Sequence, residues 1–278
     1  SIYYKVGTEL TSSNYSTVGS TTKPTGTNAG SYTVYYYVPA STNYNEASGS
    51  KTCTISAYNL SNATIANIAD QNYTGSAITP TPAVTVPIPS GSTTTLINNT
   101  DFTYSYSSNT NAGTATVTVT GKGNYTGTKT ATFTITRANT ASAAAANKTY
   151  NGSEQTGVTG SYVSWSGTTS ATAAGSYTAY ATPDSNHAWS DGTTGQKTVT
   201  WTMSAKNASN FTVTLSATTY TYDGNAKSPT VTVKDGTTTL TNNTHYTYTI
   251  TNNTNVGTAT VKITAKTGST NYTGNKSA

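Results

Sequence analysis

The chain has few charged residues, little apolar bulk and a single cysteine. Charged residues make up 8% of its 278 positions and hydrophobic residues 33%. One cysteine, Cys53, excludes an intrachain disulfide, and its alternating neighbours predict a small buried strand residue. Scarcity of cysteine in an extracellular chain is more typical of bacterial surface arrays than of small disulfide-stapled domains.

Other absences exclude whole classes of function. The 14 basic and 9 acidic residues give a net charge of +5, but no basic run exists. Nucleic-acid binders concentrate such residues, so no nucleic-acid partner is expected. The longest run of small apolar residues is 143–146, far too short for a membrane span. Helical periodicity is missing too; residues 141–147 favour a helix by composition but are too few and uncapped.

What remains is a composition suited to β-structure. The 22 tyrosines argue against disorder, which goes with few aromatics and high net charge. Tyr, Thr and Val suit a half-buried pleated surface. Strands with a period of two are predicted at residues 32–38, 102–106, 114–120, 130–135, 231–233, 246–250 and 258–264.

Three short elements recur. A small-residue turn with glycine precedes an alternating strand at Gly30, Gly113, Gly175 and Gly257, spaced by 83, 62 and 82 residues. A Tyr-x-Gly turn opens modules at residues 73–75, 150–152 and 222–224. An Asn-Tyr-Thr-Gly element lies at 124–127 and 271–274, with a looser copy at 43–45. Fixed spacing of this kind indicates a repeat array in which short and long modules alternate.

The repeats predict an all-β chain of tandem immunoglobulin-like β-sandwich modules arranged as an elongated rod. The expected modules are residues 1–57 (short), 58–137 (long), 138–204 (short) and 205–278 (long). The first is expected to lack its opening N-terminal strand and the last its closing strand. Either the array is cut from a longer one, or neighbouring chains complete the end modules by strand addition.

These motifs resemble the bacterial immunoglobulin-like repeats called MBG and YDG domains. The likeness rests on Tyr-(Asn/Asp/Thr)-Gly, on Asn-Ala-Gly-(Ser/Thr) before the central strand, and on Asn-Tyr-(Thr/Asn) before the last strand. It covers essentially the whole chain. The resemblance implies secreted, cell-wall-associated spacers or adhesin stalks of bacteria, with no catalytic residues to carry over.

Only one loop offers a candidate ligand site. Asp184, His187, Trp189 and Asp191 cluster within eight positions, where a Trp platform and polar groups could meet a sugar. The favoured interpretation is a connecting loop in which Trp189 packs at the core edge and Asp191-Gly192 makes the turn. Trp165 and Trp201 are expected in the core. No catalytic, cofactor-binding or metal-binding residues and no cofactor are expected, because His187 and His245 lie apart and acids are sparse.

The sequence therefore predicts a non-enzymatic stalk or spacer of an extracellular or bacterial cell-surface protein, which projects a functional region from the cell. Its expected partners are neighbouring modules of the same protein. The alternatives are adhesin modules that bind a glycan or host surface protein, and a self-assembling extracellular filament completed by strand exchange. Exposed tyrosines in a contiguous stripe would favour the adhesin.

Overall fold

The computed structural model describes residues 1–87 and 91–278, which divide into two compact units, 1–137 and 138–278. The division falls where the second and third predicted modules meet; the four-module scheme itself stays a prediction. Strands are the main regular elements of each unit, because alternating Thr, Tyr and Val residues place one face of each strand inward. No helix among the described residues is long and apolar enough to cross a membrane.

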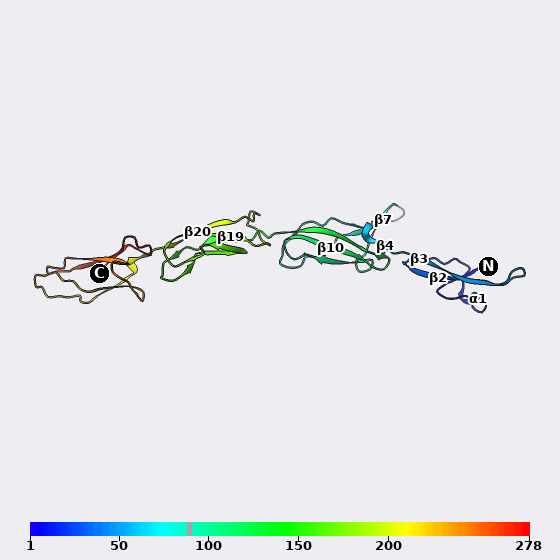
Figure 1. Ribbon diagram of the computed structural model, residues 1–278, viewed down its shortest axis with the longest axis horizontal. Helices are drawn as coiled ribbons and strands as arrows, with labels where there is room; N and C mark the ends of the chain where they lie inside the picture. Colours follow the sequence, from blue (N-terminus) through cyan, green and yellow to red (C-terminus); the bar gives the residue numbers. More distant parts are fainter. Residues whose placement is uncertain (88–90) are drawn as a thin grey trace. The chain divides into compact units, whose positions relative to one another are not determined.

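Residues 1–57 form one antiparallel sheet with the order β1-β2-β3, of which β2 and β3 make the long hairpin labelled in Figure 1. A single helical turn follows β1 and precedes β2 in the chain. Its Tyr15 ring stacks on Tyr37 with 4.7 Å between the ring centroids, and Leu10 is buried. The elements are β1 (Tyr3–Val6), α1 (Tyr15–Val18), β2 (Gly30–Val38) and β3 (Ala47–Ile55).

Residues 58–137 contain a four-stranded sheet, β6-β12-β10-β9, and a three-stranded sheet, β5-β7-β8. Phe102, Val119, Val84 and Val86 come from both sheets and share one core cluster with Leu60. The elements are β4 (Tyr58–Asn59), η1 (Leu60–Asn62), β5 (Thr64–Ile65), β6 (Gln71–Asn72), β7 (Val84–Pro87), β8 (Thr93–Thr95), β9 (Phe102–Ser107), β10 (Gly113–Gly121), β11 (Tyr125–Thr126) and β12 (Thr128–Thr136).

Residues 138–204 contain the four-stranded sheet β14-β20-β19-β17 and two small pairs, β13-β16 and β15-β18. Trp201 is fully buried among Val158, Ala179 and Met203. The elements are β13 (Ser142–Ala145), β14 (Lys148–Thr149), β15 (Gln155–Thr156), β16 (Val158–Ser161), β17 (Val163–Gly167), β18 (Ser170–Ala171), β19 (Gly175–Pro183) and β20 (Lys197–Ser204).

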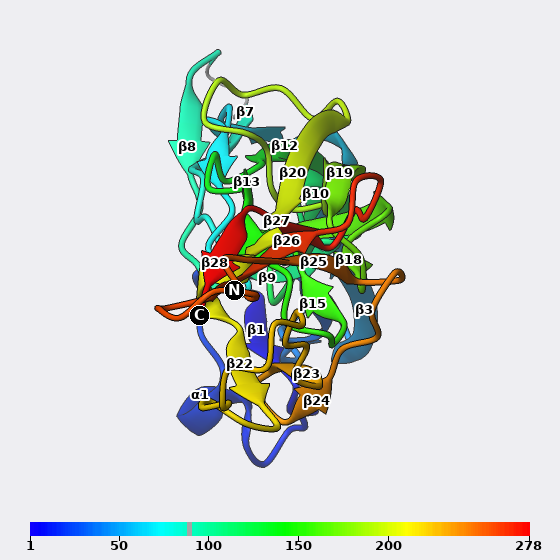
Figure 2. The ribbon, with the colours of Figure 1, turned by 90° about the vertical axis from the view of Figure 1, so that its left-hand side faces the viewer.

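Residues 205–278 repeat the pattern of 58–137 with two three-stranded sheets, β22-β23-β24 and β25-β26-β28. Strand β26 lies between β25 and β28, as Figure 2 shows. Phe211, Val233, Tyr246 and Ile263 form the core. The elements are β21 (Lys206–Asn207), η2 (Ala208–Asn210), β22 (Thr212–Leu215), β23 (Val231–Asp235), β24 (Thr238–Thr239), β25 (Tyr246–Thr251), β26 (Thr260–Ala265), β27 (Tyr272–Thr273) and β28 (Asn275–Ser277).

All seven predicted strands are present, although the last begins at Thr260 rather than Thr258. The alanine-rich stretch 141–147, too short and uncapped for a helix, contains strand β13, which pairs with β16. Two expectations need correction. Cys53 is exposed, because its strand position faces away from the residues that cover the first sheet. The last module is not without a closing strand, since Asn275–Ser277 forms the start of one against β26.

Candidate functional site

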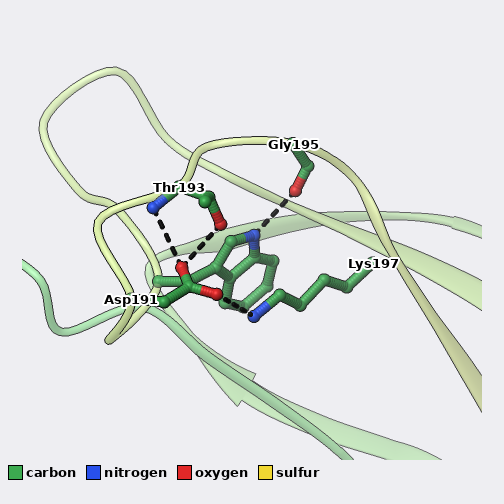
Figure 3. Close-up of polar contacts among 5 residues, drawn as sticks. Asp191, Thr193, Gly195 and Lys197 are labelled. Atoms are coloured by element: carbon green, nitrogen blue, oxygen red, sulfur yellow. Dashed lines mark hydrogen bonds and ion pairs between the residues drawn. The ribbon is translucent and has the colours of Figure 1, made fainter.

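In the loop that joins β19 to β20, polar side chains form hydrogen bonds with groups of the same loop (Figure 3). The Asp191 carboxylate accepts hydrogen bonds from the Thr193 backbone N–H at 2.9 Å and the Thr193 hydroxyl at 2.6 Å. The Lys197 ammonium lies 3.4 Å from the other carboxylate oxygen. These contacts favour the charged form and lower the pKa of Asp191, with the Thr193 hydroxyl bond as the largest cause.

Trp189 lies beneath this turn. Its indole Nε1–H donates to the Gly195 carbonyl at 2.7 Å, and the Lys197 ammonium sits 4.8 Å from the ring centroid. The side chain packs with Ala141 and Ala181 and is 3% exposed. The prediction that Trp189 packs at the core edge is confirmed, and no ring face is open as a platform for a sugar. Gly192 takes the left-handed φ of +79° that the predicted Asp-Gly turn requires.

Asp184 and His187 form a second cluster at the start of the loop. One Asp184 carboxylate oxygen lies 2.6 Å from His187 Nδ1 and accepts the Asn186 backbone N–H at 2.9 Å. The ring of Tyr162 stacks on His187 with a centroid separation of 3.9 Å. Desolvation raises the pKa of Asp184, but the bonds from His187 and Asn186 outweigh it, so the pKa lies below its usual value.

The structure thus brings the four predicted residues into two pairs. Asp184 contacts His187 directly, whereas Asp191 and Trp189 are linked by Lys197, which contacts both. Each pair uses its polar groups to hold the hairpin loop. In the described residues, no group of three or more His, Cys, Asp or Glu side chains is placed to hold a metal ion. A ligand role for this loop stays a prediction.

The loop is also a copy of a repeated element, which sequence reasoning missed. The Ala138 N–H donates to the Asn186 carbonyl at 3.0 Å. The Tyr58 N–H donates in the same way to Asn124, and the Lys206 N–H to Asn271, both at 2.9 Å. Residues 186 and 187, at the start of the candidate loop, therefore occupy the place of Asn-Tyr in this element. The replacement of Tyr by His187 hid the match.

In two of these copies the asparagine side chain reaches from a predicted long module to the predicted short module before it. Within the first unit, Asn124 Oδ1 accepts the Ala29 backbone N–H at 2.7 Å. Within the second unit, Asn271 Oδ1 accepts the Ala174 N–H at 2.8 Å. Both donors stand directly before a repeat glycine, Gly30 or Gly175. We call this repeated bond the asparagine bridge.

The rest of the Asn-Tyr-Thr-Gly element shapes the loop that carries the bridge. Gly127 and Gly274 have φ values of +75° and +77°, which favour glycine. A Cβ at Gly127 would lie 2.5 Å from Asn59 Oδ1, and one at Gly274 would lie 2.7 Å from Asn207 Oδ1. Those oxygens in turn accept the N–H of the second residue along the chain. The glycine is thus required twice, by conformation and by close approach.

Aromatic contacts reinforce the second bridge. Tyr150 contacts Tyr272 edge to face, at 5.4 Å between ring centroids. Tyr272 also packs edge to face on Phe211 and donates to the Asp235 carboxylate at 3.3 Å. Burial, followed by the proximity of Tyr150 and Asp235, raises the pKa of Tyr272. The bridge in the second unit is therefore backed by a buried aromatic cluster.

No protein-family model matches the chain, and no curated protein matches it either. Among solved structures, protocadherin gammaB7 EC3-6 is 11% identical with a TM-score of 0.22, covering 89% of this chain and 83% of that one. Protocadherin Gamma B2 extracellular cadherin domains 3-6 are 10% identical with the same TM-score, covering 89% and 81%. Likeness at this level carries no conclusion about fold or function.

Proposed function

We propose that the chain is a stretch of structural spacer, made of tandem immunoglobulin-like modules in an extracellular stalk of the bacterial MBG or YDG type. The observation that carries the proposal is the asparagine bridge, which occurs at the same place in both units. A spacer holds its two ends apart only if neighbouring modules cannot rotate freely against each other. A side chain–backbone hydrogen bond repeated at equivalent junctions supplies such a restraint.

The connections between modules agree with this role. Residues 56–59 and 204–207 pass from one module to the next without a Gly/Ser-rich stretch. The backbone of each connection enters a pair of strands directly, since β4 pairs with β11 and β21 pairs with β27. Each of these two connections therefore has few freely rotating backbone torsions, and the asparagine bridge restrains the junction further.

Tyrosine exposure favours the spacer over the adhesin. Six of the 22 tyrosines are exposed, and no more than two fall in any one predicted module. These are Tyr36, Tyr44, Tyr162, Tyr180, Tyr220 and Tyr222. A binding stripe would need a contiguous exposed set, whereas most tyrosines here face a core or a hydrogen-bond partner.

Residual dipolar couplings on the full chain test the proposal. Residues 138–204 and 205–278 should report one common alignment tensor if the bridge restrains them. The variant Asn271→Ala loses one hydrogen bond, of about 0.5–1.5 kcal/mol, so the two tensors should diverge. Asn210→Ala, an exposed asparagine of η2, is the matched control and should leave them equal. Unequal tensors in the unsubstituted protein would refute the spacer.

A further inference from the structure

Residues 241–246 and residues 97–102 form the same loop with different side chains. In each loop the third residue, Asn243 or Asn99, has a left-handed φ, of +63° and +66° respectively. The N–H of that residue donates to the carbonyl of the last loop residue at 2.7 Å in both. A lysine ammonium donates to its carbonyl in both. The two loops therefore share one backbone conformation, and a comparison of their side chains is direct.

The fifth residue is titratable in both loops but differs in kind. Asp101 accepts the Ile97 backbone N–H at 2.8 Å through one carboxylate oxygen. His245 accepts the Thr241 backbone N–H at 2.9 Å through Nδ1. Because a backbone N–H can only donate, Nδ1 supplies a lone pair and the ring proton is on Nε2. The bond from Thr241 therefore requires the neutral imidazole.

The two acceptors are lost at different pH. A carboxylate remains charged down to about pH 4, whereas an imidazole generally takes a second proton at about pH 6.5. An imidazolium has an N–H on both ring nitrogens, so that Nδ1 would face the Thr241 donor with another donor. The stability that this bond contributes is therefore present while His245 is neutral and is lost as the pH falls. The Asp101 bond survives the same mild acid.

Titratable groups of other elements surround His245. Its ring contacts Tyr272 of β27 edge to face, with 6.0 Å between the ring centroids. Asp235, at the end of β23, accepts the Tyr272 hydroxyl and is paired with Lys206 of β21. Lys266, after β26, donates its backbone N–H to the His245 carbonyl at 3.1 Å, and its ammonium binds another carbonyl of the loop. The nearby cation disfavours an imidazolium, and the nearby carboxylate is already paired.

Tyr272 connects this loop to residues 138–204. Its ring contacts Tyr150 edge to face, and the residue before it, Asn271, carries the asparagine bridge. Tyr272 is 6% exposed, so the side chains packed around it fix its position. His245 is one of those side chains, and the loop therefore supports the junction.

We propose that residues 241–246 form an acid-sensitive latch, which opens when His245 takes a proton. Opening withdraws the support of the loop from Tyr272 and loosens the junction that the Asn271 bridge restrains. The latch rests on the proposed spacer function and adds to it a junction that yields in mild acid. The junction of the first unit, whose loop holds Asp101 instead, stays restrained.

Hydrogen exchange of the Thr241 amide in the full chain tests the latch. Between about pH 7.5 and about pH 5, its protection relative to the intrinsic exchange rate should fall about tenfold, the loss expected for one hydrogen bond. His245→Asp installs the acceptor of the matching loop and should keep this protection constant. The reciprocal change, Asp101→His, should make protection of the Ile97 amide fall over the same range. Constant Thr241 protection in the unsubstituted protein, or an equal fall in His245→Asp, would overturn the proposal.

Residual dipolar couplings distinguish failure of the latch from failure of the spacer. The alignment tensors of residues 138–204 and 205–278 should agree at about pH 7.5 and diverge at about pH 5. In His245→Asp they should agree at both. Divergence already at the higher pH would refute the spacer. A relation between the tensors that is the same at both pH values, or that changes equally in His245→Asp, would refute the latch.

Discussion

The first and third predicted modules share a hairpin of the same register but bury different residues in it. In residues 1–57, Tyr32 lies opposite Cys53; in residues 138–204, Tyr177 lies opposite Trp201. Cys53 is exposed, whereas Trp201 is fully buried and stacks on Tyr177 at 4.7 Å. The repeat fixes the pairing of strands, but it does not fix what covers them.

The covering layers explain the difference. In residues 138–204, the β13–β16 region packs onto β20, and Gly157 lies directly against the indole of Trp201. In residues 1–57, the segment between β1 and β2 covers the other end of the hairpin. There Leu10 is buried and Tyr15 stacks on Tyr37. One module therefore centres its core on a tryptophan, and the other on a tyrosine cluster.

The largest expected effect comes from truncating the two equivalent positions. Trp201→Ala removes a fully buried ring and its Nε1–H bond to the Thr168 carbonyl, and should lower the free energy of unfolding by about 3–5 kcal/mol. Cys53→Ala, at the exposed counterpart, should change it by less than about 0.5 kcal/mol. Hydrogen exchange of the β19–β20 and β2–β3 amides reads each module separately. Similar losses in both would contradict the comparison.

A smaller effect is expected from the glycine under Trp201. A Cβ at Gly157 would lie 1.9 Å from the indole, so Gly157→Ala should destabilise residues 138–204 by about 1–3 kcal/mol through overpacking. Gly195→Ala is the control, because nothing lies within 4 Å of its Cβ position. In a Trp201→Ala background the Gly157→Ala cost should largely vanish. Additive costs, measured by chemical denaturation, would show that the clash is not with Trp201.

The Gly157–Trp201 contact shows where sequence reasoning stops. Period-two alternation predicted the main strands, and Asp-Gly chemistry predicted the turn at Gly192, because both signals are local. The burial of Trp189 could be predicted because tryptophan is a large, mainly apolar residue. Cys53 was misjudged because exposure depends on a covering layer far away in sequence, and two-residue strands such as β14 carry too little pattern to detect. The motif Asn-Tyr-Thr-Gly was recognised, but its bridge from Asn124 to Ala29 spans 95 positions.

The β19–β20 loop should make residues 138–204 sensitive to acid. The pKa of Asp191 is lowered because the Thr193 hydroxyl and N–H stabilise its charged form. A lowered folded-state pKa adds stability above the unfolded value of about 3.9, and that stability is lost as the pH falls through the folded value. Between about pH 5 and pH 3, exchange of the Trp189 Nε1 proton should quicken beyond its intrinsic pH dependence. Asp191→Asn should remove this excess; its persistence would exclude Asp191 as the cause.

Residues 1–57 should respond instead at high pH, with the smallest effect on stability. Tyr37 donates to the Glu46 carboxylate, and this bond together with burial raises the pKa of Tyr37 to about 12. Because the folded-state pKa is raised, the contribution is present below the unfolded value of about 10 and is lost as the pH rises through the folded one. NMR titration of ring-labelled tyrosine should show a late ionisation that Glu46→Gln moves toward the ordinary value. Since Tyr15 stacks on Tyr37, its ring signals should shift in the same titration. An unchanged late ionisation in Glu46→Gln would assign the shift to burial alone.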